Sequence, residues 1–281
     1  MNKKSIRIYA AFFSGVLIIV SAACFHAGNK DGARDRAGLI WSDEFDYSGP
    51  VDSTRWVYQT GGHGWGNRER QYYRAGTGNA EVKDGKLFIT ARKEEFEGKP
   101  YTSARITTKN RFEVQYGRIV SRMKLPSGQG IWPAFWMLGE SIDSAGWPGC
   151  GEIDIMEMIG GEGRENTVHG TAHWADSTGK HVYLGEPVTL SEGSFADGFH
   201  VFSISWDQEK IIWKMDGAAY HQQDITSPQM HAFHKPFYLL LNLAVGGDWP
   251  GYPDSNTVFP QVLEVDYVRV FALGHPPVPS R

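Results

Sequence analysis

Three acidic residues, Glu152, Asp154 and Glu157, stand close together in an otherwise apolar segment. Carboxylates this close repel one another, and proteins keep such clusters chiefly where the shifted pKa values are useful. Glycoside hydrolysis is one such use, because one protonated carboxyl protonates the leaving oxygen while an ionised carboxylate attacks the anomeric carbon. A solvated strand face and a calcium site are the alternatives, and the flanking aromatic residues disfavour both.

The spacing of these acids predicts a particular local geometry. Side chains alternate along a strand, so Glu152 and Asp154 share one face while Ile153 points into the core. Glu157 is five positions from Glu152, so strict alternation would place it on the buried face. One extra residue in a β-bulge near residues 155–156 returns Glu157 to the face of the other two acids. The sequence therefore predicts a bulged strand that carries a catalytic pair.

The elements around this strand predict an all-β fold. From Leu39 onward, short apolar or alternating runs are separated by Gly, Asp, Asn and Pro, and no amphipathic stretch is long enough for a helix. The predicted strands cover residues 86–92, 112–125, 131–138, 152–159, 167–174, 200–206, 210–215, 237–245 and 264–271. Phe202, Ile204 and Trp206 alternate with serines, which indicates a sheet with one buried face. Two such sheets must pack together.

Several motifs resemble the laminarinase-like branch of glycoside hydrolase family 16. They are WSDEF at 41–45, GWGNRE at 64–69, ARI at 104–106, GIWPAFWML at 130–138, the acidic segment GEIDIME at 151–157, NLAVGG at 242–247 and DYVRV at 266–270. The resemblance covers residues 41–271 and implies a jelly-roll β-sandwich of two antiparallel sheets with a concave substrate cleft. It also implies Glu152 as nucleophile, Asp154 as its support and Glu157 as acid/base, in the family branch that has the extra bulge residue.

Aromatic residues near the acids are candidate sugar platforms. Trp132 and Trp136 share one strand face, and the resemblance places Trp136 in the cleft; packing in the core is the alternative for both. Trp147, just before the acidic segment, is a further candidate platform. The aromatic content also suits a sandwich core, where such residues more often lie.

Polar candidates complete the expected site. The resemblance places Asn67 and Arg105 at the glycone side of the cleft, and Glu69 carries groups suited to sugar hydroxyls; a surface loop is the alternative for Asn67. His169 is expected to contact the acids, with a structural role as the alternative. His173 lies four residues further along the same predicted strand, about 13 Å away at roughly 3.3 Å per residue, which argues against a metal held jointly by the two histidines.

The resemblance also implies a structural calcium ion on the convex side. Its ligands would be the carboxylates of Glu44 and Asp266 and the backbone carbonyl of Gly85, because calcium prefers hard oxygen donors. Solvated carboxylates are the alternative. No cofactor is expected for catalysis.

The N-terminal segment differs from the rest of the chain. Lys3, Lys4 and Arg7 precede an apolar run over residues 9–20 and small residues at 21–23, as in an export signal. The run is shorter than the roughly 20 residues of a membrane-spanning helix. Cys24 follows, as in the lipobox of bacterial lipoproteins, although Ser21 stands where Leu is usual. The sequence therefore predicts a lipid anchor to the outer membrane or cell surface, with simple secretion as the alternative.

These patterns predict a signal peptide over residues 1–24, a flexible linker over 25–38, one catalytic domain over 39–273 and a tail over 274–281. The net charge of -4 and the absence of a dense basic tract in the domain argue against nucleic acid as a partner. With Cys24 and Cys150 as the two cysteines, disulfides do not hold the domain together. No H-E-x-x-H, G-x-S-x-G, P-loop or C-x-x-C motif is present.

The sequence thus predicts a monomeric, retaining endo-glycosidase that hydrolyses laminarin-type β-1,3-glucan. Two alternatives stay open. In the first alternative, the enzyme acts on mixed-linkage glucan or a marine galactan instead of β-1,3-glucan, because loop shapes decide linkage preference. A non-catalytic glucan-binding lectin on the same sandwich is the second alternative, and the paired Glu152 and Glu157 argue against it.

Overall fold

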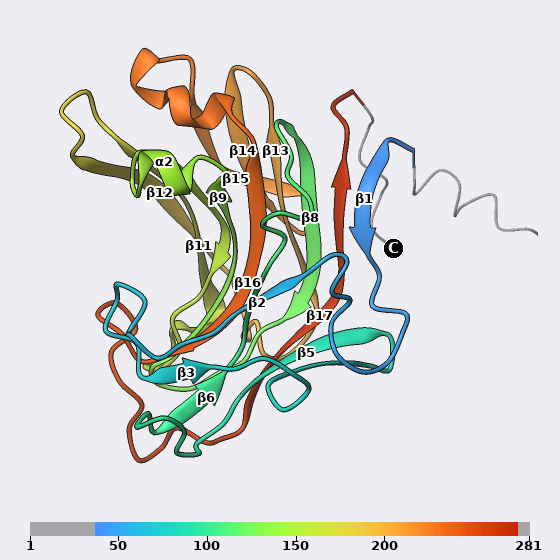
Figure 1. Cartoon of the computed structure of the whole chain (residues 1–281), viewed down its shortest axis with the longest axis vertical. Coiled ribbons are helices and arrows are strands. Elements are labelled where there is room, and N and C mark those ends of the chain that lie inside the picture. The colour runs from blue at the N-terminus through green and yellow to red at the C-terminus, as the bar shows by residue number, and fades with distance from the viewer. Residues whose placement is uncertain (1–36, 275–281) are drawn as a thin grey trace, which may run out of the picture.

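The computed structural model describes residues 37–274, which form two antiparallel sheets packed face to face (Figure 1). The predicted export signal, Cys24, the linker up to residue 36 and the tail from residue 275 lie outside the described residues. Within the described part, no helix is long and apolar enough to span a membrane. The expected jelly-roll sandwich is confirmed.

One sheet, here called the cleft sheet, carries the three acids. Its strand order is β12-β11-β10-β9-β16-β7-β2. The bounds are β2 (Val57–Gln59), β7 (Arg105–Thr107), β9 (Ile131–Gly139), β10 (Glu152–Glu157), β11 (Thr167–Ala175), β12 (His181–Thr189) and β16 (Phe237–Val245). Strands β9, β11 and β16 curve together along this side of the molecule, as Figure 1 shows.

The other sheet, here called the back sheet, has the order β15-β14-β13-β8-β17-β5-β4, with β1 paired to β17. The bounds are β1 (Leu39–Asp43), β4 (Ala80–Lys83), β5 (Lys86–Ala91), β8 (Gly117–Lys124), β13 (His200–Trp206), β14 (Lys210–Met215), β15 (Ala218–Asp224) and β17 (Gln261–Phe271). A short parallel pair joins β3 (Gln71–Tyr73) to β6 (Tyr101–Ser103). The described helical segments are α2 (Ile142–Ala145), η1 (Arg164–Asn166) and η2 (Pro228–His234).

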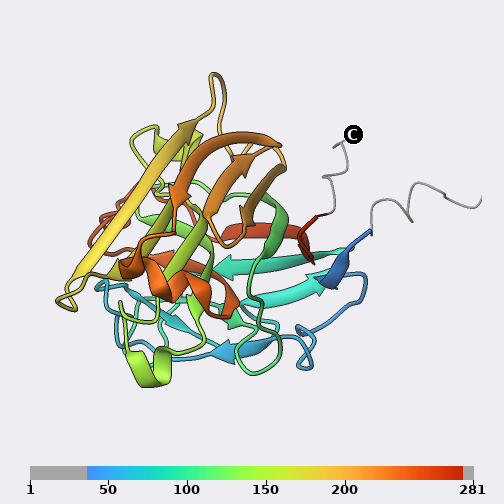
Figure 2. The same cartoon turned by 90° about the horizontal axis from the view of Figure 1, so that it is seen from above.

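The core lies between the two sheets, which Figure 2 shows from above. Phe135 and Ile153 of the cleft sheet and Trp206 and Trp213 of the back sheet are fully buried there. Burying one large apolar side chain contributes about 1.5–3 kcal/mol, so the packing of these side chains helps to hold the cleft sheet on the back sheet.

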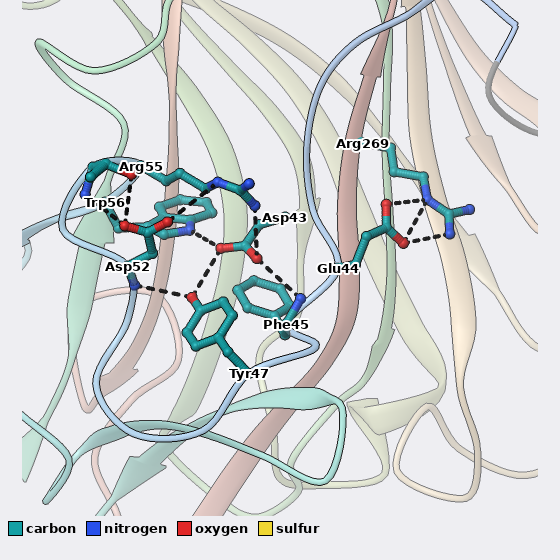
Figure 3. Close-up of polar contacts among 9 residues, drawn as sticks. Asp43, Glu44, Phe45, Tyr47, Asp52, Arg55, Trp56 and Arg269 are labelled. Carbon is teal, nitrogen blue, oxygen red and sulfur yellow. Dashed lines mark hydrogen bonds and ion pairs between the residues drawn. The ribbon is translucent and has the colours of Figure 1, made fainter.

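A buried carboxylate ties the start of the sandwich together, as Figure 3 shows. Asp43 is fully buried and accepts hydrogen bonds from the Phe45 backbone N–H at 3.0 Å, the Tyr47 hydroxyl at 3.1 Å and the Trp56 indole at 2.8 Å. Arg55 lies 3.3 Å from the same carboxylate. The charge is therefore fully compensated, as a buried carboxylate requires.

Two of the predicted calcium ligands are engaged by arginines. Glu44 accepts hydrogen bonds from Arg269 on both carboxylate oxygens, at 2.9 and 2.7 Å (Figure 3), and Asp266 accepts one from Arg122 at 2.8 Å. Strand register brings the β4–β5 turn, which contains Gly85, and the end of β1 to the same stretch of β17. The donors are hard oxygens that suit calcium, but an ion bound here would compete with both arginines.

Candidate active site

Strand β10 carries the predicted bulge. Glu152 and Asp154 pair with Leu138 and Trp136 of β9, and the register then shifts so that Met156 pairs with Phe135. Ile155 and Met156 are both buried, and Glu157 returns to the face of the other acids. The indole N–H of Trp213, from the back sheet, donates to the Asp154 carbonyl at 2.7 Å where the bulge begins. The sequence-based prediction of the bulge is confirmed.

The acids lie in a cleft of about 730 Å³ on the cleft sheet. All the predicted catalytic and substrate-binding residues line it: Asn67, Arg105, Trp132, Trp136, Trp147, Glu152, Asp154, Glu157 and His169. Glu69 lines it as well. Residues from five stretches of sequence thus meet in one place, which the strand predictions alone could not show.

Each of the three acids has a different environment. Asp154 is buried, with an exposed fraction of 3%. Its Oδ2 lies 2.9 Å from His173 Nε2. Glu152 Oε1 lies 3.8 Å from the same nitrogen. Glu157 Oε1 accepts a hydrogen bond from the Trp132 indole at 3.0 Å, so Trp132 is a site residue and not a core residue.

Burial raises the pKa of all three carboxyls. The pKa of Glu152 rises to about 8 because of burial and the charge of Asp154, against the opposing charges of His173 and Arg105. Burial raises the pKa of Asp154 to about 8. The pKa of Glu157 is raised well above its usual range, first by burial and then by the charges of Asp154 and Glu152. The site therefore retains protons at pH values where an exposed carboxyl has lost its own.

Arg105 forms the other wall of the cleft. Its guanidinium lies between the rings of Trp65 and Trp136, 4.6 and 4.7 Å from their centroids. Trp136 donates its indole N–H to Asn242 at 2.7 Å, which fixes the ring in the cleft. Arg105 Nε donates to Gln59 at 2.5 Å, and the other N–H groups of the guanidinium are donors of the kind that suits sugar hydroxyls.

Glu69 is buried beside Asn67 and does not present a free carboxylate to the cleft. It accepts hydrogen bonds from Gln71 at 2.5 Å, Tyr73 at 3.1 Å and Asn67 at 3.3 Å. Burial raises its pKa. Glu69 therefore holds Asn67 in place.

Two histidines lie next to the acids. His169, which the sequence predicted to contact the acids, is the cross-strand partner of Glu157, whereas His173 comes within ion-pair distance of Glu152 and Asp154. His169 lines the cleft and packs against Trp249, with ring centroids 5.0 Å apart. Both histidines face the cleft because they are four residues apart on β11, and cross-strand register places His173 opposite Glu152.

Further residues of the cleft were not singled out from sequence. The aromatic and polar ones include His63, Trp65, His181, Tyr183, Asn242 and Trp249. Trp249 comes from the loop after β16 and meets Trp132 at 5.5 Å between centroids. His181 lies against Trp147 at 4.5 Å, and Trp147 is 50% exposed. Rings facing an open groove suit the C–H faces of sugars.

The site combines two partly buried glutamates, an acid between them and walls of indole and guanidinium groups. This chemistry suits cleavage of a glycosidic bond, and with the sandwich it defines a glycoside hydrolase of the jelly-roll type.

Comparison with known proteins gives the family. The model for glycosyl hydrolases family 16 matches residues 67–269, and the chain belongs to this family. A β-glucanase of Rhodothermus marinus is 45% identical over 96% of this chain and 96% of its own length. The laminarinase catalytic domain of Thermotoga maritima is 46% identical with a TM-score of 0.75, covering 83% of this chain and 97% of that one. The laminarinase of Rhodothermus marinus is 43% identical with a TM-score of 0.76, covering 83% and 96%.

Proposed function

We propose that this chain is a retaining endo-glycosidase that hydrolyses β-1,3-glucan of the laminarin type. The observation that carries the proposal is the bulge in β10, which brings Glu152 and Glu157 to one face of the cleft. The names of its relatives, laminarinase and β-glucanase, support the same substrate class.

The proposed reaction has two steps. Glu152 attacks the anomeric carbon while Glu157 gives its proton to the leaving glycosidic oxygen, which forms a glycosyl ester on Glu152. Glu157, now ionised, takes a proton from water, and the water oxygen displaces Glu152 with net retention of the β-anomer. Asp154 supports Glu152 and adds negative charge near Glu157, which favours the protonated acid.

Product analysis tests the substrate. The protein is incubated with laminarin, lichenan, agarose and carrageenan, and the products are sized. We expect laminarin to give the fastest release of oligosaccharides of mixed length. Faster cleavage of lichenan would favour a mixed-linkage enzyme, and cleavage of agarose or carrageenan alone would favour a galactanase. Binding of glucans with no new reducing ends from any of them would favour a lectin.

Two further proposals concern parts of the molecule outside the cleft. The N-terminal segment and Cys24 support export with a lipid anchor, followed by a linker that separates the anchor from the catalytic domain. Glu44, Gly85 and Asp266 support a structural calcium ion, which would replace Arg269 and Arg122 as partners of the two carboxylates.

A further inference from the structure

Glu152, Asp154 and His173 form a cluster with the geometry of a metal site. One oxygen of each carboxylate and one ring nitrogen of His173 all lie within 4.8 Å of one another. His173 Nε2 is 2.9 Å from Asp154 Oδ2 and 3.8 Å from Glu152 Oε1. Tetrahedral ligands at zinc-bond lengths lie roughly 3.3 Å apart, so small side-chain shifts bring all three atoms to bonding distance.

A second observation concerns Asp154 itself. The side chain is buried with 3% exposure, and its Oδ2 accepts no hydrogen bond although His173 Nε2 is 2.9 Å away. The contact therefore lacks the angle of a hydrogen bond. A buried carboxylate oxygen without a donor is costly, and a cation placed between Asp154 and His173 would satisfy it.

His181 supplies the outer partner that metal-binding histidines usually have. Its Nε2 lies 2.9 Å from His173 Nδ1, and the two rings are inclined by 14°. A hydrogen bond on the outer nitrogen fixes the ring and leaves the inner nitrogen, Nε2 of His173, available as a ligand 2.9 Å from Asp154 Oδ2. His181 is held in turn against Trp147.

We infer that Glu152, Asp154 and His173 bind one divalent transition-metal ion of the zinc or copper type, and that this ion reversibly inhibits hydrolysis. Binding of the ion displaces the protons of the two carboxyls, and the resulting two carboxylates with a neutral imidazole balance its double charge. One nitrogen and two oxygen ligands suit zinc and copper, whereas calcium and magnesium prefer oxygen alone. The inhibitory part rests on the proposed role of Glu152, because an oxygen bound to a metal is not free to attack a sugar.

Zinc chloride is the probe for this site. The purified protein is freed of metal with a chelator and titrated with zinc by calorimetry, while initial rates on laminarin are measured over the same zinc range. We expect one zinc ion per chain and inhibition whose midpoint follows the dissociation constant. The midpoint should rise with laminarin concentration, because ion and substrate exclude each other, and added chelator should restore the rate.

Three variants separate this cluster from other histidines of the cleft. His173→Asn removes a ligand and should weaken zinc binding by about 10-fold or more. His181→Phe keeps a ring against Trp147 but removes the outer hydrogen bond, and should weaken zinc binding by about 10–100-fold. His169→Asn is the matched control, since His169 faces the same cleft outside the cluster, and it should bind zinc as the unmodified protein does. Inhibition is scored against the zinc-free rate of each variant.

The outcomes distinguish this inference from the proposed function. Absence of calorimetric zinc binding, or unchanged binding in His173→Asn, overturns the metal site whatever the enzyme cleaves. Zinc binding that requires His173 but leaves hydrolysis unaffected overturns the inhibition. Zinc binding that requires His173, in a protein that cleaves no β-glucan, supports the site and overturns the proposed function together with the inhibition.

Discussion

At the scale of single residues, the three acids are distinguished by their neighbours. Asp154 raises the pKa of both glutamates and His173 lowers both. Arg105 further lowers the pKa of Glu152, whereas the charge of Glu152 further raises that of Glu157. Glu157 therefore keeps a proton to higher pH than Glu152. Two groups whose environments separate their pKa values in this order match the roles of nucleophile and general acid.

Truncation of either glutamate should abolish most hydrolysis. Both side chains line the cleft and fill no core volume, so Glu152→Ala and Glu157→Ala should fold. Loss of a general acid costs about 10²–10⁴-fold in rate, and loss of the nucleophile should cost more. Added formate should partly restore only Glu152→Ala. Reducing ends from laminarin are measured, with the exposed Glu186→Ala on β12 as control. Near-normal turnover of either cleft variant would refute the assignment.

The hydrogen bond from Trp132 should set the alkaline limit of activity. It lowers the pKa of Glu157, opposing burial and the neighbouring charges. Trp132→Phe removes the donor, so the pKa of Glu157 should rise. Because the proposed reaction needs protonated Glu157, the alkaline limb of kcat/KM against pH should move to higher pH.

Trp136→Phe is the matched control for this pH profile, since the Trp136 indole donates to Asn242 and not to an acid. Its alkaline limb should stay in place even if KM changes. An unchanged or lowered limb in Trp132→Phe would show that this hydrogen bond does not control the acid.

The acids were predictable from sequence because three charges in an apolar strand have few explanations. The contact of His173 was not, because His169 and His173 face the same side of β11 and only the register with β10 decides which one reaches Asp154. Trp65 and Trp249 lie in loops, and the spacing of apolar residues along the sequence does not predict the course of a loop. The sequence therefore predicted the acids of the cleft better than the histidine and loop residues around them.

At the scale of elements, the bulge in β10 is what joins the two glutamates. Deleting Met156 should either remove the bulge, with a shifted Glu157, or turn the later side chains to the wrong face. Met156 is fully buried, so Met156→Leu keeps the residue count and nearly the volume, at a cost below about 1.5 kcal/mol. Hydrolysis of laminarin and circular dichroism are compared. A deletion variant that folds and cleaves as well as Met156→Leu would disprove this role.

Strand prediction succeeded where alternation or burial was strong. The ranges 200–206, 210–215 and 237–245 coincide with β13, β14 and β16. The predicted strand from Phe112 was wrong in its first part, because β8 begins at Gly117 and Tyr116 has a φ of 66°, which breaks an extended chain. Strand β12 was missed because it is an edge strand with mostly exposed side chains and a proline.

At the scale of the whole molecule, the back sheet is where calcium would act. If the ion binds Glu44, Gly85 and Asp266, calcium at about 100 times its dissociation constant stabilises the fold by roughly 2.7 kcal/mol. Thermal unfolding with calcium and with chelator should therefore differ in Tm. Asp266→Asn should lose most of this difference, and Glu81→Gln, which alters a partly exposed acid of β4, should keep it. Equal Tm values with and without calcium in the unmodified protein would exclude the site.

In the described part of the chain, the last residue of β1, Asp43, is fixed by its own buried network. We expect a lipid on Cys24 to anchor the protein without altering catalysis. Cys24→Ser should move the protein from the membrane fraction to the soluble exported fraction, with kcat and KM on laminarin unchanged. Fractionation followed by immunoblotting measures this, with Cys150→Ser as the control that keeps Cys24. Retention of Cys24→Ser in membranes would show that another feature holds the protein there.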